Sequence, residues 1–466
     1  MKKLHEYQKE MVKRICQQPR VALFLDLGLG KTIISLQAVL KLIGEGSVKK
    51  ALVIAPKTVV ESVWRQEAEA WQLPLRVSVV TGNAKQREKA LHDETASVFV
   101  ISRDNLAWLF QQDFEADMLI VDESTSFKDR STQRWASLMQ KTIHVAGKKI
   151  SRKQPMINMF KRVVLLSATP ASETYAGLWS QIALLYPKGN PLGETITAFR
   201  NEYMVPSFFG GSMYPQYVKM KPGAIERINE KLKDICVSMR KEDYLQLPER
   251  LDIIRKLNGV NEYYNRMAKY GVIHIDNTDI IAGDVLTKYG KLQQLSSGFI
   301  YDETGGIHVV NKIKEQALQE MIECNQENIL VMYRFETEKK MLLNMGAVPL
   351  ETPESIAMWK QGKIKLGILY PASGGYGLNL ASGGHIIIWY TLPLSLEQYI
   401  QSNGRIHRQG QTKPVRIYHL LATPMDEYIY KLLQSKCDVL NGLMKFFSNG
   451  EGGKKHEEYS RCIGER

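Results

Sequence analysis

A short glycine-rich stretch contains residue types that can hold a nucleoside triphosphate. Residues 25–32 read LDLGLGKT and stand between an apolar run and a helical pattern. Backbone N–H groups at Gly28 and Gly30 can face the phosphates of the nucleotide. Lys31 can reach the β and γ oxygens, and Thr32 can offer its hydroxyl to Mg²⁺. The full phosphate-loop pattern has glycine at its first position, where this chain has leucine, so an ordinary glycine-rich turn is the alternative interpretation.

A pair of adjacent carboxylates supplies the second candidate for chemistry. Residues 118–123 read MLIVDE, in which four apolar residues precede Asp122 and Glu123. A carboxylate at the end of a strand beside a phosphate loop can hold Mg²⁺, and the next carboxylate can orient or deprotonate the attacking water. We assign Asp122 to the metal and Glu123 to the water. An isolated pair would more simply begin a solvated loop, but the order of the two motifs favours ATP hydrolysis.

Two arginines in the second half of the chain can act on the same nucleotide. Residues 401–411 read QSNGRIHRQGQ, and on a helix the spacing of Arg405 and Arg408 places both guanidinium groups on one face. The pair can stabilise charge on the γ-phosphate if this part of the chain closes over the first. A surface helix with two solvated arginines is the alternative. Upstream, residues 372–380 read ASGGYGLNL, and their small side chains allow a ligand or a nucleic-acid backbone to approach closely.

The length, composition and net charge of the chain indicate a large protein that binds a polyanion. The chain has 466 residues, of which 44% are hydrophobic, and this is enough for two or three domains with full cores. The formal net charge of +13 favours nucleic acid as a partner, with a generally basic, solvated surface as the alternative. No apolar run approaches a membrane span and the first ten residues are too polar for a signal peptide, so we expect a cytosolic protein. The five cysteines are scattered, which predicts reduced thiols and no zinc site.

These candidate residues must be positioned by alternating strands and helices. In the first 185 residues short apolar runs alternate with helical patterns such as Ile33–Leu42, which is typical of a parallel sheet covered by helices. A similar rhythm returns in the second half, so the sequence predicts two α/β lobes. The predicted strands are Val21–Leu25, Ala51–Ala55, Val77–Val80, Val98–Ser102, Met118–Val121 and Val163–Ser167, then Leu251–Leu257, Ile329–Tyr333, Lys365–Tyr370 and His385–Tyr390.

Helical and irregular additions interrupt this rhythm. From about residue 189 the composition shifts to glycine, proline and aromatic residues and then to a charged helical pattern at Ala224–Ile235, which indicates an insertion. We also expect a mobile basic loop at 144–159, with a nucleic-acid contact as the alternative, helices over 261–290 and a flexible tail from Ser448 onward. The predicted domains are lobe 1 (1–188), its insertion (189–246), the start of lobe 2 with a helical insertion (247–310), the lobe 2 core (311–440) and the tail (441–466).

The ordered set of motifs resembles the superfamily 2 helicase-like ATPases and, within them, the Swi/Snf family of double-stranded DNA translocases. The resemblance extends over residues 4–412, nearly the whole chain, and GRIHRQGQ is similar to the Swi/Snf version of its motif. The matching stretches are LHEYQ (4–8, adenine reading), DLGLGKT (26–32, phosphate loop), LVIAPKTVVESVWRQE (52–67, the first DNA-contact motif with its tryptophan), VDESTSFKD (121–129, Mg²⁺), LLSATP (165–170, coupling) and the second-lobe signatures GGYGLNL (374–380) and QSNGRIHRQGQ (401–411).

The resemblance implies two RecA-like lobes with the ATP site in the cleft between them, and it carries residue roles. Gln8 would contact adenine, and Gly28, Gly30 and Gly377 would approach the nucleotide. The remaining roles fall to Lys31, Thr32, Asp122 and Glu123 (triphosphate and Mg²⁺), Arg405 and Arg408 (closure over the nucleotide), Ser167 and Thr169 (coupling of hydrolysis to lobe movement), and Lys57, Arg103 and Ser373 (DNA backbone).

One departure from the family pattern concerns coupling. After the paired acids the family often has alanine or glycine and then histidine, whereas this chain has Ser124 and Thr125.

The additions are short and contain nothing like a histone reader, so we expect a compact bacterial or bacteriophage enzyme in the cytoplasm of a bacterial cell or an infected host. The predicted function is ATP-dependent translocation on double-stranded DNA, with single-stranded DNA as a further candidate partner. A strand-separating DNA or RNA helicase and an ATP-gated nucleic-acid clamp are the alternatives.

Overall fold

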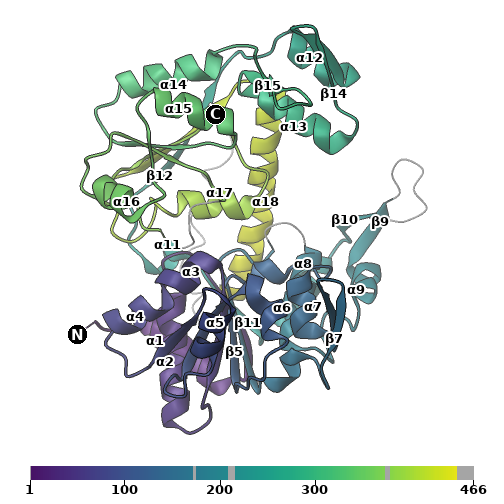
Figure 1. The fold of residues 1–466 in the computed structure, drawn as a ribbon, viewed down its shortest axis with the longest axis vertical. Coiled ribbons are helices and arrows are strands. Elements are labelled where there is room, and N and C mark those ends of the chain that lie inside the picture. Colours follow the sequence, from purple (N-terminus) through teal and green to yellow (C-terminus); the bar gives the residue numbers. More distant parts are fainter. Residues whose placement is uncertain (1, 172–174, 208–215, 373–377, 449–466) are drawn as a thin grey trace. The chain divides into compact units, whose positions relative to one another are not determined.

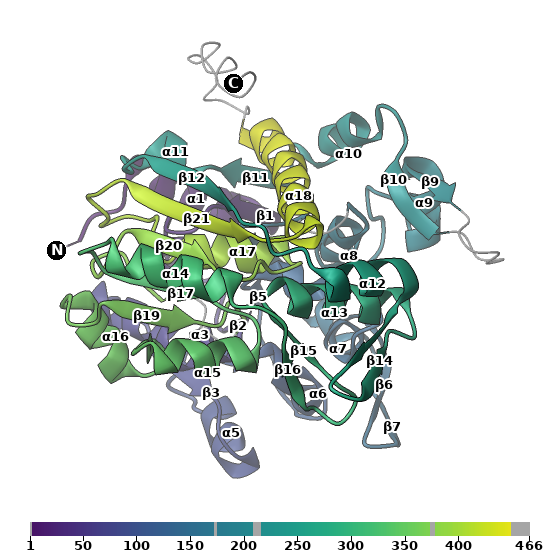
Figure 2. The same ribbon diagram turned by 90° about the horizontal axis from the view of Figure 1, so that it is seen from above.

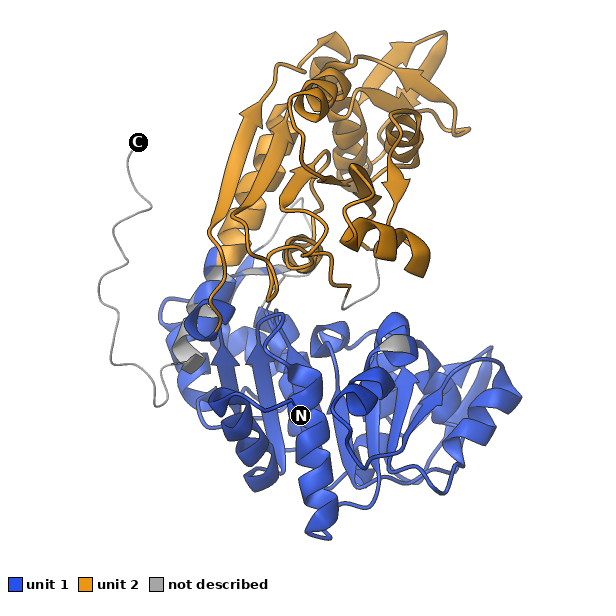
Figure 3. Ribbon diagram, turned by 90° about the vertical axis from the view of Figure 1, so that its left-hand side faces the viewer, with its two compact units in different colours: residues 1–244, 438–466 blue, residues 245–437 orange. Residues whose placement is uncertain are grey.

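The computed structural model describes residues 2–171, 175–207, 216–372 and 378–448, whose helices and strands are labelled in Figure 1 and Figure 2. The chain divides into two compact units, coloured separately in Figure 3. Unit 1 comprises residues 1–244 and 438–466, and unit 2 comprises residues 245–437. Among the described residues, no helix is both long and apolar enough to cross a membrane.

Apolar runs in unit 1 form a seven-stranded sheet in the order β11-β1-β8-β5-β2-β4-β3. Every neighbouring pair in this sheet is parallel, and its central strands are buried along nearly their whole length. Burial on both faces explains why these strands read as continuous apolar runs rather than alternating ones. The strands are β1 (Arg20–Leu25), β2 (Ala51–Ala55), β3 (Val77–Val80), β4 (Val98–Ser102), β5 (Met118–Val121), β8 (Arg162–Ser167) and β11 (Cys236–Met239).

Helices and two antiparallel hairpins complete unit 1. The α-helices are α1 (Glu6–Gln17), α2 (Lys31–Gly44), α3 (Lys57–Ser62), α4 (Trp64–Ala70), α5 (Ala84–Leu91), α6 (Leu106–Leu109), α7 (Gln133–Met139), α8 (Tyr175–Leu185), α9 (Ile196–Tyr203), α10 (Ala224–Leu232) and α11 (Lys241–Tyr244). The 3₁₀ turns are η1 (Arg103–Asn105), η2 (Ser124–Phe127) and η3 (Met156–Met159), and the hairpins pair β6 (Thr142–Val145) with β7 (Lys148–Ser151) and β9 (Met204–Ser207) with β10 (Gln216–Met220).

Unit 2 contains a second parallel sheet, in the order β12-β21-β20-β17-β19-β18, and Figure 2 shows β21, β20 and β17 side by side. The expected α/β class with two parallel-sheet lobes is therefore confirmed. The strands are β12 (Arg250–Lys256), β17 (Ile329–Met332), β18 (Val348–Pro349), β19 (Leu366–Leu369), β20 (Ile386–Trp389) and β21 (Val415–Leu421), and two hairpins pair β13 (Val272–Ile275) with β14 (Thr278–Ile281) and β15 (Phe299–Tyr301) with β16 (Ile307–Val309).

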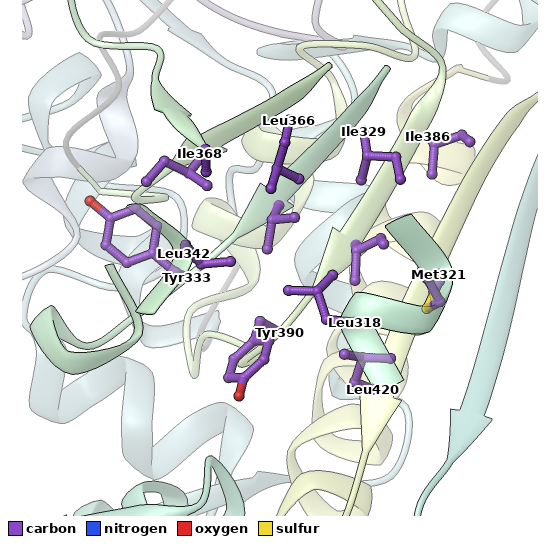
Figure 4. Close-up of a cluster of buried hydrophobic side chains, with 13 residues drawn as sticks. Leu318, Met321, Ile329, Tyr333, Leu342, Leu366, Ile368, Ile386, Tyr390 and Leu420 are labelled. Atoms are coloured by element: carbon purple, nitrogen blue, oxygen red, sulfur yellow. The ribbon is translucent and has the colours of Figure 1, made fainter. Parts of the chain in front are cut away.

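A core of aliphatic and aromatic side chains holds the unit 2 sheet to its helices. Leu318 and Met321 of α14 and Leu342 of α15 pack with residues of the central strands in one buried cluster (Figure 4). Ile329 and Ile386 belong to the same cluster, so the sheet and both helices share one core. The helices assigned to this unit are α12 (Glu262–Tyr270), α13 (Val285–Ser296), α14 (Ile313–Glu323), α15 (Glu336–Asn344), α16 (Pro353–Lys360) and α17 (Leu396–Asn403), and α18 (Pro424–Ser448) begins here and ends in unit 1.

Several of the predicted additions differ from the structure. Residues 144–159 are not simply a loop, because they include most of the β6–β7 hairpin and η3. The range 261–290 is helical only at its two ends, with the β13–β14 hairpin between. Within the predicted insertion, β11 joins the sheet beside β1. The predicted tail begins inside α18, where the carbonyl of Met444 accepts a hydrogen bond from the Ser238 hydroxyl, and residues after 448 lie outside the described part of the chain.

A histidine joins the two hairpins of unit 2, and it predicts a pH-dependent contribution to stability. His308 on β16 bonds Asp276 in the β13–β14 turn through Nδ1 (2.8 Å) and Asp302 through Nε2 (3.1 Å). These two hydrogen bonds raise the pKa of His308, that to Asp276 most. A raised pKa contributes stability that is fully present below the ordinary value of about 6.5 and is lost as the pH rises through the raised value.

We therefore expect His308→Gln to lower the melting temperature more at pH 6 than at pH 9. Thermal melting of the variant and the wild type at both pH values measures the difference. Equal losses at the two pH values would show that the imidazolium form adds nothing to the contact.

Candidate active site

The segment between β1 and α2 has the backbone geometry of a phosphate-binding turn. Gly28 and Gly30 have φ angles of 90° and 82°, in the left-handed region that favours glycine. Gly30 is the N-cap residue of α2, so Lys31 and Thr32 occupy the first turn of the helix, where backbone N–H groups lack helical partners. The Lys31 Nζ donates to the carbonyl of Leu25 at 2.8 Å, which holds the lysine over the turn.

Gln8 of α1 lies directly against this turn. Its Nε2 donates to the Leu29 carbonyl at 3.2 Å, and its Oε1 accepts from the backbone N–H of His5 at 3.0 Å. The side chain is buried. A Cβ added at Gly30 would lie 2.4 Å from the Gln8 Nε2, so the Gln8 amide occupies the space that a side chain at this position would take. The structure thus brings the predicted adenine-contacting residue to the predicted phosphate turn.

Asp122 lies at the same edge of the sheet. It follows β5, which is separated from β1 by β8 alone, and parallel strands have their carboxyl ends at one edge. Its Oδ2 accepts a hydrogen bond of 3.2 Å from the Trp64 Nε1, and both side chains are buried. Burial raises the pKa of Asp122, and the charge of Lys31 acts in the opposite direction. The lysine of the turn and the carboxylate are therefore close enough to interact.

Glu123 has a strained backbone. Its φ and ψ are 52° and 61°, a left-handed conformation that costs a residue other than glycine about 1–3 kcal/mol and that occurs preferentially at functional sites. Its backbone N–H donates to the Asp122 Oδ1 at 3.1 Å, and its side chain is only 5% exposed. The conformation turns the chain sharply at the end of β5, so the two adjacent carboxylates leave the strand in a fixed arrangement.

The predicted coupling residues are buried beside these groups. Ser167 ends β8, the strand between β1 and β5, and its Oγ accepts a 3.0 Å hydrogen bond from the backbone N–H of Thr169. Both side chains are fully buried. Within the part of the chain that the structure describes, the Thr169 hydroxyl has no hydrogen-bond partner. A buried hydroxyl in this state can form a bond when a group or segment moves toward it.

Two of the three predicted DNA-contacting residues also follow strands of this sheet. Lys57 begins α3 directly after β2 and is exposed, and Arg103 begins η1 directly after β4 and is half-buried. Because β2 and β4 are neighbours, both residues lie on the carboxyl edge that also carries the phosphate turn. Ser373, the third, and Gly377, assigned to the nucleotide, lie outside the described residues.

Arg405 and Arg408 do not lie on a helix, which corrects the sequence-based interpretation. α17 ends at Asn403, and Gly404 leads into a turn that contains both arginines. The Arg408 Nη1 donates to the Leu378 carbonyl at 3.2 Å, and burial lowers the pKa of Arg408. Arg405 is buried and Arg408 is half-buried, so the turn does not expose the two side chains on a helical face.

Sequence reasoning missed the role of Trp64. The motif resemblance does not indicate that the Trp64 indole is fully buried and bonds the carboxylate assigned to the metal. No feature of the sequence around α4 marks this contact, since it depends on how α4 packs beside the end of β5.

A phosphate turn and a strand-end carboxylate pair at one edge of a parallel sheet define a phosphate-loop ATPase. The SNF2-related domain family matches residues 7–297, more than half of the chain, and the chain belongs to this family. It is accordingly a helicase-like ATP hydrolase.

The chain matches one relative over nearly that protein's whole length and another over less than half of that protein's length. The chain is 28% identical to protein p41 of Acyrthosiphon pisum secondary endosymbiont phage 1, over 94% of this chain and 97% of that protein. It is 21% identical to the chromatin structure-remodeling complex subunit snf21 of Schizosaccharomyces pombe, over 94% of this chain but only 39% of that protein. A solved structure, the Sulfolobus solfataricus SWI2/SNF2 ATPase core in complex with dsDNA, is similar over 96% of this chain and 95% of that chain, at 18% identity and a TM-score of 0.44.

Proposed function

We propose that this ATPase moves along double-stranded DNA without separating its strands. The observation that carries the proposal is the shared sheet edge, where the nucleotide-site candidates follow β1 and β5 and the basic residues Lys57 and Arg103 follow β2 and β4. Cations beside an ATP site can bind DNA phosphates while ATP is turned over. Membership of the SNF2-related family and the formal net charge of +13 support a polyanionic track.

The nucleotide roles follow from position. We assign Gln8 to the adenine, because it is fixed against the turn that precedes α2. Lys31 binds the β and γ oxygens once it leaves the Leu25 carbonyl, and the free N–H groups of the first turn of α2 bind the phosphates. Glu123 orients and deprotonates the attacking water. The phage relative supports a site of action in the cytoplasm of a bacterial cell or infected host.

The residues present also fit Mg²⁺. A buried carboxylate (Asp122) and a hydroxyl on the first turn of α2 (Thr32) are oxygen donors of the kind that this ion prefers. We propose that these two residues hold it. When bound, the ion neutralises charge on the phosphate oxygens.

Trp64→Phe is expected to raise the Mg²⁺ concentration for half-maximal ATP hydrolysis about tenfold, the lower end of the effect of losing a hydrogen bond to a metal ligand. The change removes the N–H that fixes the Asp122 carboxylate and keeps a large aromatic ring in the core. Titrations of ATPase activity with Mg²⁺ measure the effect. Trp71→Phe is the matched control, because that indole, just after the same helix, bonds Glu67 instead. An unchanged midpoint in Trp64→Phe would contradict the assignment.

Movement along DNA requires that ATP hydrolysis change how the protein binds DNA. We propose that Arg405 and Arg408 stabilise charge on the γ-phosphate in a closed state, and that hydrolysis releases this state. Ser167 and Thr169 would transmit the change within unit 1. Because Lys57 and Arg103 would contact the backbone rather than base edges, binding should depend weakly on sequence and strongly on salt.

Steady-state ATP hydrolysis with and without nucleic acid tests the proposal. Duplex DNA should stimulate hydrolysis more than single-stranded DNA or RNA, and raised salt should weaken the stimulation. Displacement of a third strand from a DNA triplex then tests for movement, and unwinding of a forked duplex tests for strand separation. Unwinding would identify a helicase, and stimulated hydrolysis without triplex displacement would identify an ATP-gated clamp.

A further inference from the structure

A buried glutamine outside the recognised motifs bonds two of the turns that surround the active site. Gln181 lies on α8 and is completely buried. Its Oε1 accepts a hydrogen bond of 2.8 Å from the Ser124 hydroxyl. Its Nε2 donates to the carbonyl of Pro170 at 2.6 Å and to that of Gly177, one turn earlier in its own helix, at 3.2 Å. The amide therefore bridges the turn after β5 and the turn after β8.

Both ends of this bridge lie next to residues of the site. Ser124 directly follows the strained Glu123 and begins η2. Pro170 directly follows Thr169, whose N–H is bonded to the Ser167 hydroxyl. The two turns leave neighbouring strands, since β5 pairs with β8. The two turns are thus joined through a single side-chain amide.

α8 is held against the first of these turns by further contacts. A Cβ added at Gly177 would lie 3.0 Å from the Lys128 Cβ, so the helix packs closely on the residue that follows η2. The Trp135 Nε1 donates to the Ser180 carbonyl at 3.4 Å. The packing of α8 therefore places Gln181 between the two turns.

The bridge also accounts for the departure from the family pattern. This chain has Ser124 where alanine or glycine is usual in the family, and its hydroxyl donates one of the two bonds. We infer that Gln181 is a positioning residue that couples the carboxylate turn at Ser124 to the Ser167–Pro170 turn. It would act in place of the family's histidine, at whose position this chain has Thr125. Chains of hydrogen bonds between packed elements can carry such coupling. The inference rests on the proposed function only for its readout with DNA.

Two variants break the bridge. Ser124→Ala removes the hydroxyl and leaves the Pro170 bond. Gln181→Met, of similar volume, removes the bonds at both ends, whereas a glutamate in this buried site would be protonated and its O–H could still donate to the Pro170 carbonyl. Ser137→Ala is the matched control, because Ser137 is equally buried in unit 1 but its hydroxyl donates to the Gln133 carbonyl of its own helix.

The first readout needs no DNA. Hydrogen–deuterium exchange of the 163–171 segment is compared with and without a non-hydrolysable ATP analogue. The analogue should protect this segment in the wild type and in Ser137→Ala, and the protection should be lost in the bridge variants although they still bind the analogue. Equal protection in the bridge variants, or no protection in the wild type, would overturn the inference.

The second readout separates coupling from folding. Basal ATP hydrolysis should stay within about twofold of wild type, while duplex-stimulated hydrolysis falls about tenfold, the factor that corresponds to one buried hydrogen bond. An equal fall in both rates would mean that the bridge is merely structural. If duplex DNA fails to stimulate the wild-type enzyme, the proposed function fails, and the exchange experiment still decides the inference.

Discussion

Glu123→Ala is expected to lower kcat for ATP hydrolysis by about 10²–10⁴-fold, the usual contribution of a general base. The carboxylate is buried at a strained turn beside Asp122, and this arrangement fixes its direction. Glutamine is the better second variant, because Glu123→Gln keeps the shape of the side chain at this strained turn and removes only its basicity. Single-turnover hydrolysis of radiolabelled ATP measures the chemical step directly.

The binding of ATP distinguishes this effect from damage to the site. Glu123→Gln should bind ATP with nearly wild-type affinity, whereas Lys31→Ala should lose both binding and hydrolysis, because Lys31 is assigned to the phosphates. Glu69→Ala, an exposed acid on α4, serves as the control for the loss of a negative charge. Wild-type turnover by Glu123→Ala would refute its assignment as the base and leave water activation to another group.

Much of the parallel fold could be predicted because its strands are buried on both faces. The predicted strands Ala51–Ala55, Val77–Val80, Val98–Ser102 and Met118–Val121 have the same bounds as β2 to β5. Each is a short run that is almost entirely apolar, as expected where helices cover both sides of a sheet. A turn between β1 and α2 could also be predicted, since glycine is the residue type that most readily adopts the positive φ of Gly28 and Gly30.

Other elements depend on contacts that no local pattern records. β21 (Val415–Leu421) lies inside the unit 2 sheet but carries polar residues such as Arg416 and His419, so its sequence did not mark it as a strand. β11 is a four-residue edge strand whose pairing with β1 is set by tertiary structure. The Trp64 and Gln181 contacts are of the same kind, because each joins residues more than fifty positions apart in the sequence.

The local structure predicted for the segment that contains Arg405 and Arg408 was wrong, although the motif itself was recognised. Three-residue spacing suggested a helix, but Gly404 follows the last helical residue and ends α17. Gln411 then bonds the carbonyls of Ala381 and Gly384 at 2.9 Å each, which ties the end of the turn to the segment after the second-lobe glycines. The glycines in QSNGRIHRQGQ were the signal that could have predicted a turn.

Arg408→Lys is expected to lower kcat for ATP hydrolysis about 10³-fold, the lower end of the effect of an arginine that stabilises charge in phosphoryl transfer. Lysine keeps the positive charge but lacks the planar fork of donors. In the structure that fork is anchored by the Nη1 bond to Leu378, which leaves the guanidinium in a fixed orientation that an ammonium group cannot reproduce. Steady-state kinetics with saturating ATP and duplex DNA measure the change.

The pattern of kcat and binding then identifies what Arg408 does. A residue that acts only in the transition state lowers kcat and leaves the affinity for ATP nearly unchanged, whereas a residue that holds the ground state weakens binding as well. Arg255→Lys is the matched control, since Arg255 lies in the same unit but pairs with Glu320 on the surface. If Arg408→Lys hydrolyses ATP at the wild-type rate, the turn that contains it is structural and charge on the γ-phosphate must be stabilised by other groups. If affinity and kcat fall together, Arg408 contributes to nucleotide binding rather than to the chemical step alone.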